Sequence, residues 1–93
     1  MKTIISNREA IEQLSGMTYF SYSACEMIIK HYEVTDDEYL FDPTQISEGW
    51  HEYTAEEIME EHGVTPRELS DSVVHFYPVK SDIGRTFLFT FGD

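Results

Sequence analysis

The chain has 93 residues, of which 41 % are hydrophobic and 14 % aromatic, and it carries a formal net charge of -12 at pH 7. A chain of this length forms one domain, residues 1–93, and its apolar content argues against disorder despite the charge. The charge also argues against direct binding to nucleic acid or to an anionic membrane, because both are polyanions and the six basic residues are scattered along the sequence.

The sequence predicts an intracellular protein. Cys25 is the single cysteine, so it cannot form an internal disulfide, and a reducing cytoplasm fits best. Polar residues interrupt the N-terminal segment before an apolar run of signal-peptide length develops. No segment approaches the roughly 20 apolar residues that a membrane helix needs. We therefore expect a cytoplasmic location.

Four short helices are predicted from capping boxes, in which a Ser or Thr precedes a Glu by three residues. The four pairs are Ser6 with Glu9, Ser23 with Glu26, Thr54 with Glu57, and Thr65 with Glu68. Ser21 is an alternative start for the second helix. The first helix should end near Gly16. The third should span residues 55–62 with Gly63 as its C-cap, and the fourth residues 66–70.

Extended segments are predicted from apolar patterns and turn residues. They are residues 45–53, 73–79 and 86–91, of which the last alternates strictly between two faces. Asp42 and Pro43 mark a turn before the first segment, Gly49 is a predicted bulge within it, and residues 82–84 join the other two. Because a two-stranded hairpin is marginal alone, we expect an α+β fold. It consists of a small three-stranded antiparallel sheet with three to four short helices packed on one face.

The most distinctive feature is a block of acidic residues, without lysine or arginine, between His31 and Pro66. Its members are Glu33, Asp36, Asp37, Glu38, Asp42, Glu48, Glu52, Glu56, Glu57, Glu60 and Glu61. Charge of one sign destabilises a compact fold through self-repulsion, so the block needs another explanation. Either the acids serve solubility, or the protein imitates a polyanion or docks on a basic partner.

The predicted helix over residues 55–62 carries two like-charge pairs, each four residues apart. These are Glu56 with Glu60, and Glu57 with Glu61. Each pair costs about 0.2–0.5 kcal/mol, and the helix dipole disfavours the two acids near the C-terminal end. A partner-binding row of carboxylates would explain this arrangement, and a merely solvated helix face is the alternative. The candidate surface is extended by Asp36, Asp37, Glu38, Glu48 and Glu52.

Catalytic and metal sites are weaker interpretations. The possible metal ligands nearest in sequence are His51, Glu57, Glu61 and His62. They match no metalloprotease helix pattern. Cys25 could form a nucleophile pair with His31 or His75, yet its place on an apolar helix stripe is typical of a buried thiol. We therefore expect no enzyme activity, no metal and no cofactor.

Trp50 is either a core anchor or an exposed contact residue.

Three short motifs resemble those of small acidic proteins encoded by phages and mobile elements. They are Phe20-Ser21-Tyr22 before a helix, Phe41-Asp42-Pro43 before a strand, and Glu52-Tyr53-Thr54-Ala55-Glu56-Glu57 leading into a helix that Gly63 closes. The second helix here is shorter and less acidic than is usual in that family. By size, charge and charge placement, the chain is also similar to the DNA-mimic inhibitors that phages and plasmids use against restriction enzymes and CRISPR effectors.

The function that follows is a non-enzymatic, DNA-mimicking inhibitor from a phage or mobile element. Its anti-CRISPR or anti-restriction activity would block the basic nucleic-acid-binding groove of a host defence protein, in the host cytoplasm. We expect no direct contact with nucleic acid or membrane, and the oligomeric state stays open. The alternative is a small acidic adaptor or regulator that binds a protein without mimicking DNA. A metal-dependent enzyme is a third interpretation.

Overall fold

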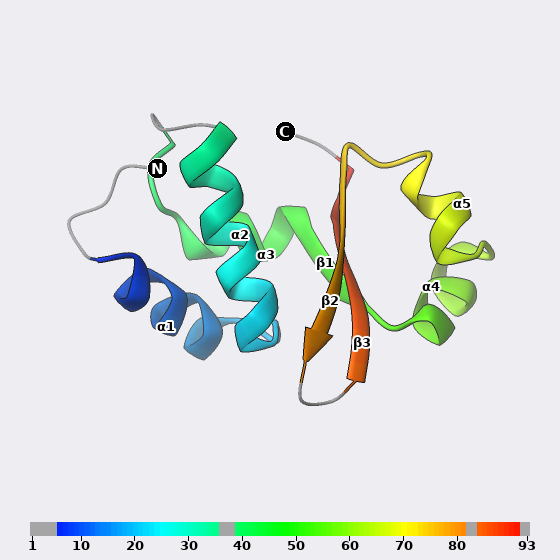
Figure 1. Ribbon diagram of the computed structural model, residues 1–93, viewed down its shortest axis with the longest axis horizontal. Helices are drawn as coiled ribbons and strands as arrows, with labels where there is room; N and C mark the ends of the chain where they lie inside the picture. Colours follow the sequence, from blue (N-terminus) through cyan, green and yellow to red (C-terminus); the bar gives the residue numbers. More distant parts are fainter. Residues whose placement is uncertain (1–5, 36–38, 82–83, 92–93) are drawn as a thin grey trace.

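The computed structural model describes residues 6–35, 39–81 and 84–91, and these ranges contain five helices and three strands (Figure 1). In chain order the elements are α1 (Asn7–Met17), α2 (Tyr22–Thr35), α3 (Pro43–Gly49), β1 (Trp50–Tyr53), α4 (Ala55–His62), α5 (Pro66–Ser70), β2 (His75–Ser81) and β3 (Gly84–Thr90). The predicted α+β class and the three-stranded antiparallel sheet are confirmed.

Strand β3 lies at the centre of the sheet, with β1 and β2 antiparallel on either side of it. Trp50 of β1 and His75 of β2 both pair with Thr90, and nearer the hairpin turn Tyr53 pairs with Phe87. Directly opposed residues point to the same face, so the register assigns each side chain to one of two faces. We call them the Trp50 face and the Phe89 face, after the largest buried side chain on each.

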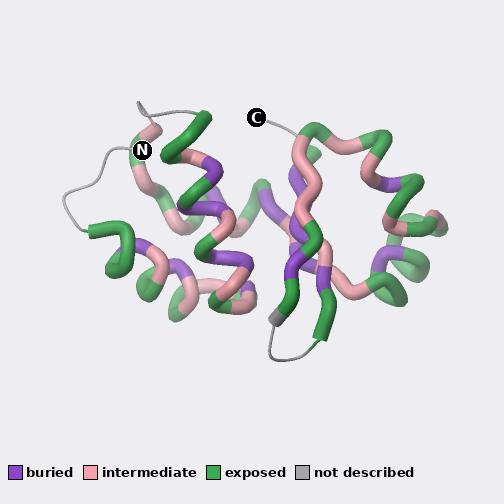
Figure 2. Tube along the Cα trace, in the orientation of Figure 1, coloured by how far each residue is buried: buried purple, intermediate pink, exposed green. Residues whose placement is uncertain are grey.

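Helices cover both faces of the sheet, so the prediction that they pack on one face is wrong (Figure 1). The Trp50 face packs against α1, α2 and α3 through Leu14, Ile28 and Ile46. The Phe89 face packs against α4 and α5 through Ile58 and Leu69. The polar residues of β3 conceal this arrangement, because Thr86 and Thr90 are buried on the Trp50 face while Phe89 is buried on the other. Figure 2 shows buried segments in the sheet and in the helices on either side of it.

The predicted strand over residues 45–53 is wrong in its first half, because α3 occupies it and only Trp50–Tyr53 forms β1. The side chain of Asp42 accepts hydrogen bonds from two backbone N–H groups of the first helical turn, at 3.1 and 3.3 Å. Pro43 follows at the first helical position. This pair of residues therefore starts a helix here instead of making a turn, and Gly49 ends that helix instead of forming a bulge.

The remaining helices begin at predicted capping residues. Ser21, the alternative start, opens α2, since its Oγ accepts the N–H of Ala24 at 3.2 Å. Helices α4 and α5 have the predicted bounds, and Thr54 and Thr65 form complete capping boxes at their N-termini. Gly63 closes α4 with φ 69, in the left-handed region that favours glycine.

Strands β2 and β3 lie within two residues of the predicted segments 73–79 and 86–91. The predicted turn at residues 82–84 falls largely outside the described residues, because 82 and 83 are not described and Gly84 begins β3. None of the helices in the described part of the chain has the length and apolar character needed to cross a bilayer.

Candidate functional site

Helix α4 presents its acidic residues on the side away from the sheet. Ile58 is fully buried against the Phe89 face and fixes the orientation of the helix. At about 100° per residue, Glu56 and Glu60 then lie on the opposite side, both exposed. Glu61 lies on one flank of this row, and Met59, half-exposed, lies on the other. The structure thus brings Glu56 and Glu60 together on the outer side of α4, while Glu61 is exposed on a flank nearer to the sheet.

Glu57 has a second role that separates it from the other acids of α4. Its carboxylate accepts the backbone N–H of Thr54 at 2.9 Å, which completes the capping box at the helix N-terminus. The side chains of Glu56, Glu60 and Glu61, by contrast, make no hydrogen bond or ion pair with any residue that the structure describes. Three carboxylates therefore remain available to a partner, and Glu57 adds charge beside them.

Glu52 was predicted to extend the acidic surface, and this prediction is wrong because its side chain is buried, only 8 % exposed. It lies on the Trp50 face, where its carboxylate accepts three hydrogen bonds. Two come from the backbone N–H and the Oγ of Ser21, each at 2.7 Å, and one comes from Thr86 Oγ1 at 2.6 Å. Ser21 precedes α2, so the dipole of that helix also favours the negative charge. Glu52 is a structural anion.

The other predicted extensions of the surface do not join the α4 row. Glu48 is exposed, but it belongs to α3 on the Trp50 side of the sheet and not to a strand face shared with Glu52. The loop acids Asp36, Asp37 and Glu38 lie outside the described residues. The acidic surface that the structure supports is therefore α4 itself.

Trp50 is a core anchor, which resolves the two alternatives left by the sequence. It is 2 % exposed, and its Nε1–H donates to the hydroxyl of Tyr32 at 3.1 Å. Beside it, His31 is buried with Nδ1 2.8 Å from the hydroxyl of Tyr77, and its ring centroid lies 4.3 Å from that of His75. Burial, and secondarily His75, lower the pKa of His31. These groups hold α2 to the sheet.

A second histidine pair lies on the Phe89 face. The rings of His51 and His62 both pack against Phe89, at centroid distances of 5.4 and 5.9 Å. Burial, and secondarily His62, lower the pKa of His51. Each pair thus combines one histidine from a strand with one from a helix, at the contact between the sheet and a helix layer.

Cys25 and the candidate metal ligands show no reactive arrangement. Cys25 is fully buried, and burial raises the pKa of its thiol to about 11, so the thiolate is scarce at neutral pH. Among the described residues, no group of three or more His, Cys, Asp or Glu side chains is placed to hold a metal ion.

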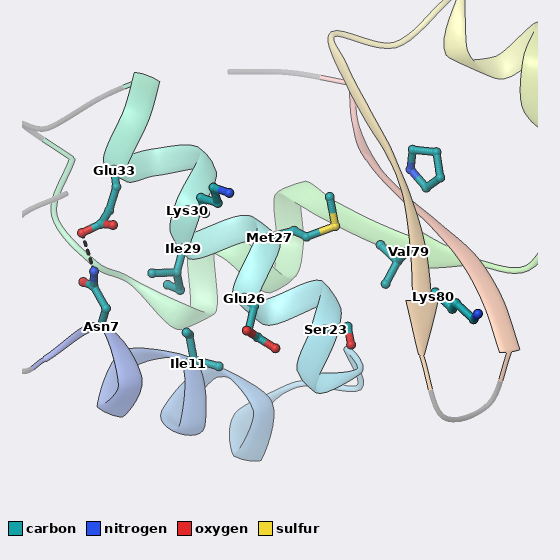
Figure 3. A pocket seen from close by; sticks show the side chains of 11 residues that line it. Asn7, Ile11, Ser23, Glu26, Met27, Ile29, Lys30, Glu33, Val79 and Lys80 are labelled. Atoms are coloured by element: carbon teal, nitrogen blue, oxygen red, sulfur yellow. Dashed lines mark hydrogen bonds between the residues drawn. The ribbon is translucent and has the colours of Figure 1, made fainter.

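A groove that sequence reasoning missed lies between α1, α2 and β2, with a volume of about 590 Å³ (Figure 3). Met27 extends from α2 toward β2, and Ile11 of α1 lines the other side. At one end, Asn7 donates a hydrogen bond to Glu33, and Lys80 points away from the opening. The lining charges include both Glu26 and Lys30, so the groove presents charge of mixed sign, which makes it a weaker candidate for a basic partner than α4. In the sequence, the only sign of this groove is that apolar residues such as Ile11 and Met27 lie at the edges of the buried stripes of α1 and α2.

The chain matches no protein-family model, no curated protein and no solved structure. The resemblance to phage and mobile-element proteins therefore stays a prediction.

Proposed function

We propose that this protein is a non-enzymatic inhibitor that mimics DNA. In the proposal, a phage or mobile element encodes it, and in the host cytoplasm α4 enters the basic nucleic-acid-binding groove of a CRISPR effector or restriction enzyme. The observation that carries the proposal is that Glu56, Glu60 and Glu61 are exposed on α4 and make no hydrogen bond or ion pair with the described residues. No cofactor or metal is required, because occupation of the groove is the whole mechanism.

Two structural features support a binding role for this helix over simple solvation. First, α4 is held rigidly, by Ile58 in the core and by caps at both ends. Second, neighbouring carboxylates one turn apart, with Cβ atoms about 5–6 Å from each other, oppose folding and bring no compensating ion pair. A rigid helix that retains repulsive charge offers a preorganised anionic surface, and preorganisation reduces the entropic cost of binding.

A specific observation favours the adaptor as a second candidate. Three apolar or aromatic side chains are exposed where α1 leads into α2: Met17 at 59 %, Tyr19 at 62 % and Tyr22 at 46 %. Aromatic side chains of this kind are common centres of protein–protein contacts. An adaptor that binds through them would tolerate neutralisation of α4.

The two candidates are separated by a competition experiment on a partner isolated with the tagged protein from host lysate. The purified partner is titrated with labelled DNA in the presence of this protein, between about 0.1 M and 1 M salt, where the Debye length falls from about 10 Å to 3 Å. The mimic should exclude DNA and lose affinity steeply as salt rises. Simultaneous binding of DNA and protein, with little salt dependence, would establish the adaptor instead.

A matched pair of variants tests the helix itself. The test variant neutralises Glu56, Glu60 and Glu61 to Gln, and the control neutralises Glu12, Glu26 and Glu48, which are exposed in the helix layer on the Trp50 face. Both remove the same charge. The proposal predicts that only the first loses affinity strongly. An equal loss in both variants would assign the effect to net charge and exclude α4 as a specific contact.

A further inference from the structure

The β2–β3 hairpin places two cations directly opposite each other. Lys80 of β2 pairs with Arg85 of β3, and both side chains are exposed. Opposed residues in an antiparallel pair have Cβ atoms roughly 4.5–5.5 Å apart, so like charges there are destabilising. Within the described ranges, neither side chain makes an ion pair or a side-chain hydrogen bond.

Fold stability does not account for this pair. A lysine on an edge strand such as β2 can be explained as protection against pairing with another chain. Arg85 has no such explanation, because β3 is the central strand and already has a neighbour on each side. In a chain with only six basic residues, two of them occupy one cross-strand position at the turn end of the sheet. Figure 1 shows that this end of the hairpin projects past α4 and α5.

The cationic pair lies next to an apolar row that leads to the acidic helix. Two residues before Lys80, Pro78 pairs with Phe87, and Phe87 also pairs with Tyr53 of β1. Because residues two apart on a strand share a face, this row and the cationic pair both lie on the Phe89 face. The chain leaves β1 after Tyr53 and enters α4 at Ala55. The row runs across the sheet from Pro78 to Tyr53. The cationic pair lies beside the Pro78 end, two residues nearer the hairpin turn, and α4 begins two residues after the Tyr53 end.

We propose that Lys80 and Arg85 together bind a carboxylate group of the protein partner. Arg85 can form two parallel hydrogen bonds to a carboxylate, and Lys80 adds a second positive charge within reach of the same group. A protein carboxylate fits better than a nucleic-acid or membrane phosphate, because the net charge of -12 repels an extended polyanion and not a single acidic side chain. The location of that carboxylate, beside the partner's basic groove, rests on the proposed function of α4.

With a carboxylate bound at Lys80 and Arg85, the partner-binding surface has a positive end at the hairpin turn and a negative end at α4. The acidic helix alone attracts a basic groove in more than one orientation, because electrostatic attraction between extended surfaces is weakly directional. A cationic contact at the hairpin turn permits only the orientation in which the partner's acidic group lies beneath it. The pair is therefore an orientation determinant, and its like-charge repulsion is relieved on binding.

The test is an NMR titration of the isotope-labelled protein with the peptide acetyl-tri-glutamate amide, and with acetyl-tri-glutamine amide as the neutral control. We expect saturable shifts of the Lys80 amide and of the Arg85 Nε–H with the acidic peptide only. The variant that combines Lys80→Gln with Arg85→Gln should lose them. The control variant Lys30→Gln with Arg67→Gln changes two exposed basic residues that are not opposed, and it should retain them.

Four results would overturn the proposal: no saturable shift, equal shifts at Lys30 and Arg67, retention of the shifts in the double hairpin variant, or saturation by inorganic phosphate alone. The titration uses no partner, so its failure leaves the DNA competition of α4 untouched. Conversely, if the partner binds DNA and this protein together while the peptide still saturates the hairpin, the carboxylate contact stands and mimicry fails.

Discussion

The carboxylate of Glu52 accepts a hydrogen bond from the hydroxyl of Thr86 at 2.6 Å, inside the contact between the sheet and α2. Glu52 lies on β1 and Thr86 on β3, and Ser21 completes the site from the start of α2. One buried anion therefore connects a helix to two strands. In a chain with excess negative charge, this acid contributes to the fold and not to the surface.

Replacing Glu52 with Gln should lower the free energy of unfolding by about 1–3 kcal/mol, because the amide nitrogen cannot accept the hydrogen bonds that one carboxylate oxygen accepts. Urea denaturation measures the change. Glu48→Gln is the matched control, since Glu48 is exposed and should change stability by no more than about 0.5 kcal/mol. Equal midpoints for the two variants would show that the Glu52 network contributes little.

Neutralising the central pair of α4, with Glu56→Gln and Glu60→Gln, should leave stability unchanged or raise it by about 0.2–0.5 kcal/mol, because a like-charge pair is removed. Thr54→Ala on the same helix should instead cost about 0.5–2 kcal/mol, since it removes the N-cap. Thermal melting monitored by circular dichroism compares the variants. A destabilised double Gln variant would mean that these carboxylates make contacts that stabilise the fold.

Phe89→Ala should cost about 3–5 kcal/mol, because the ring is fully buried at the centre of the cluster on the Phe89 face. Phe87→Ala should cost less, since that side chain is only partly buried. Chemical denaturation gives both values. The reverse order would contradict the position of α4 and α5 on the sheet.

Stability should fall as the pH decreases through about 6.5, the ordinary pKa of histidine in an unfolded chain. The pKa values of His31 and His51 are lowered in the folded protein, so below that pH the unfolded chain binds more protons than the folded one. This loss precedes most carboxylate protonation, which is centred near pH 4. Melting temperatures between about pH 7.5 and 5.5 measure it, and His51→Gln should flatten the slope. A melting temperature constant over this range would exclude the linkage.

Local signals account for the parts of the fold that were predicted well. The bounds of α4 and α5 follow from capping residues within one turn of each helix start, and such signals need no information from distant residues. The α3 segment shows the limit of this reasoning, because Asp42 and Pro43 are compatible with a turn or with a helix start. Only the packing of Ile46 in the core favours the helix.

The errors at the candidate site come from long-range contacts. Glu52 reads as one more acid of the block, and its donors Ser21 and Thr86 are 31 and 34 residues away in sequence. Likewise, the alternation in β3 shows two faces but cannot show that each receives its own helix layer. The Lys80–Arg85 pair was accessible in principle, because a two-residue connection between the strands sets their register.

The central position of β3 also determines the order in which the molecule can assemble. Strands β1 and β2 do not pair with each other, so neither has a hydrogen-bonded neighbour until β3, the last element in chain order, has been synthesised. Both core clusters likewise depend on it, through Leu88 on one face and Phe89 on the other. Until then the helices lack the sheet on which both layers pack, and short helices without such packing are marginal in water. The domain should therefore fold late and cooperatively, once β3 has left the ribosome and can pair with both β1 and β2.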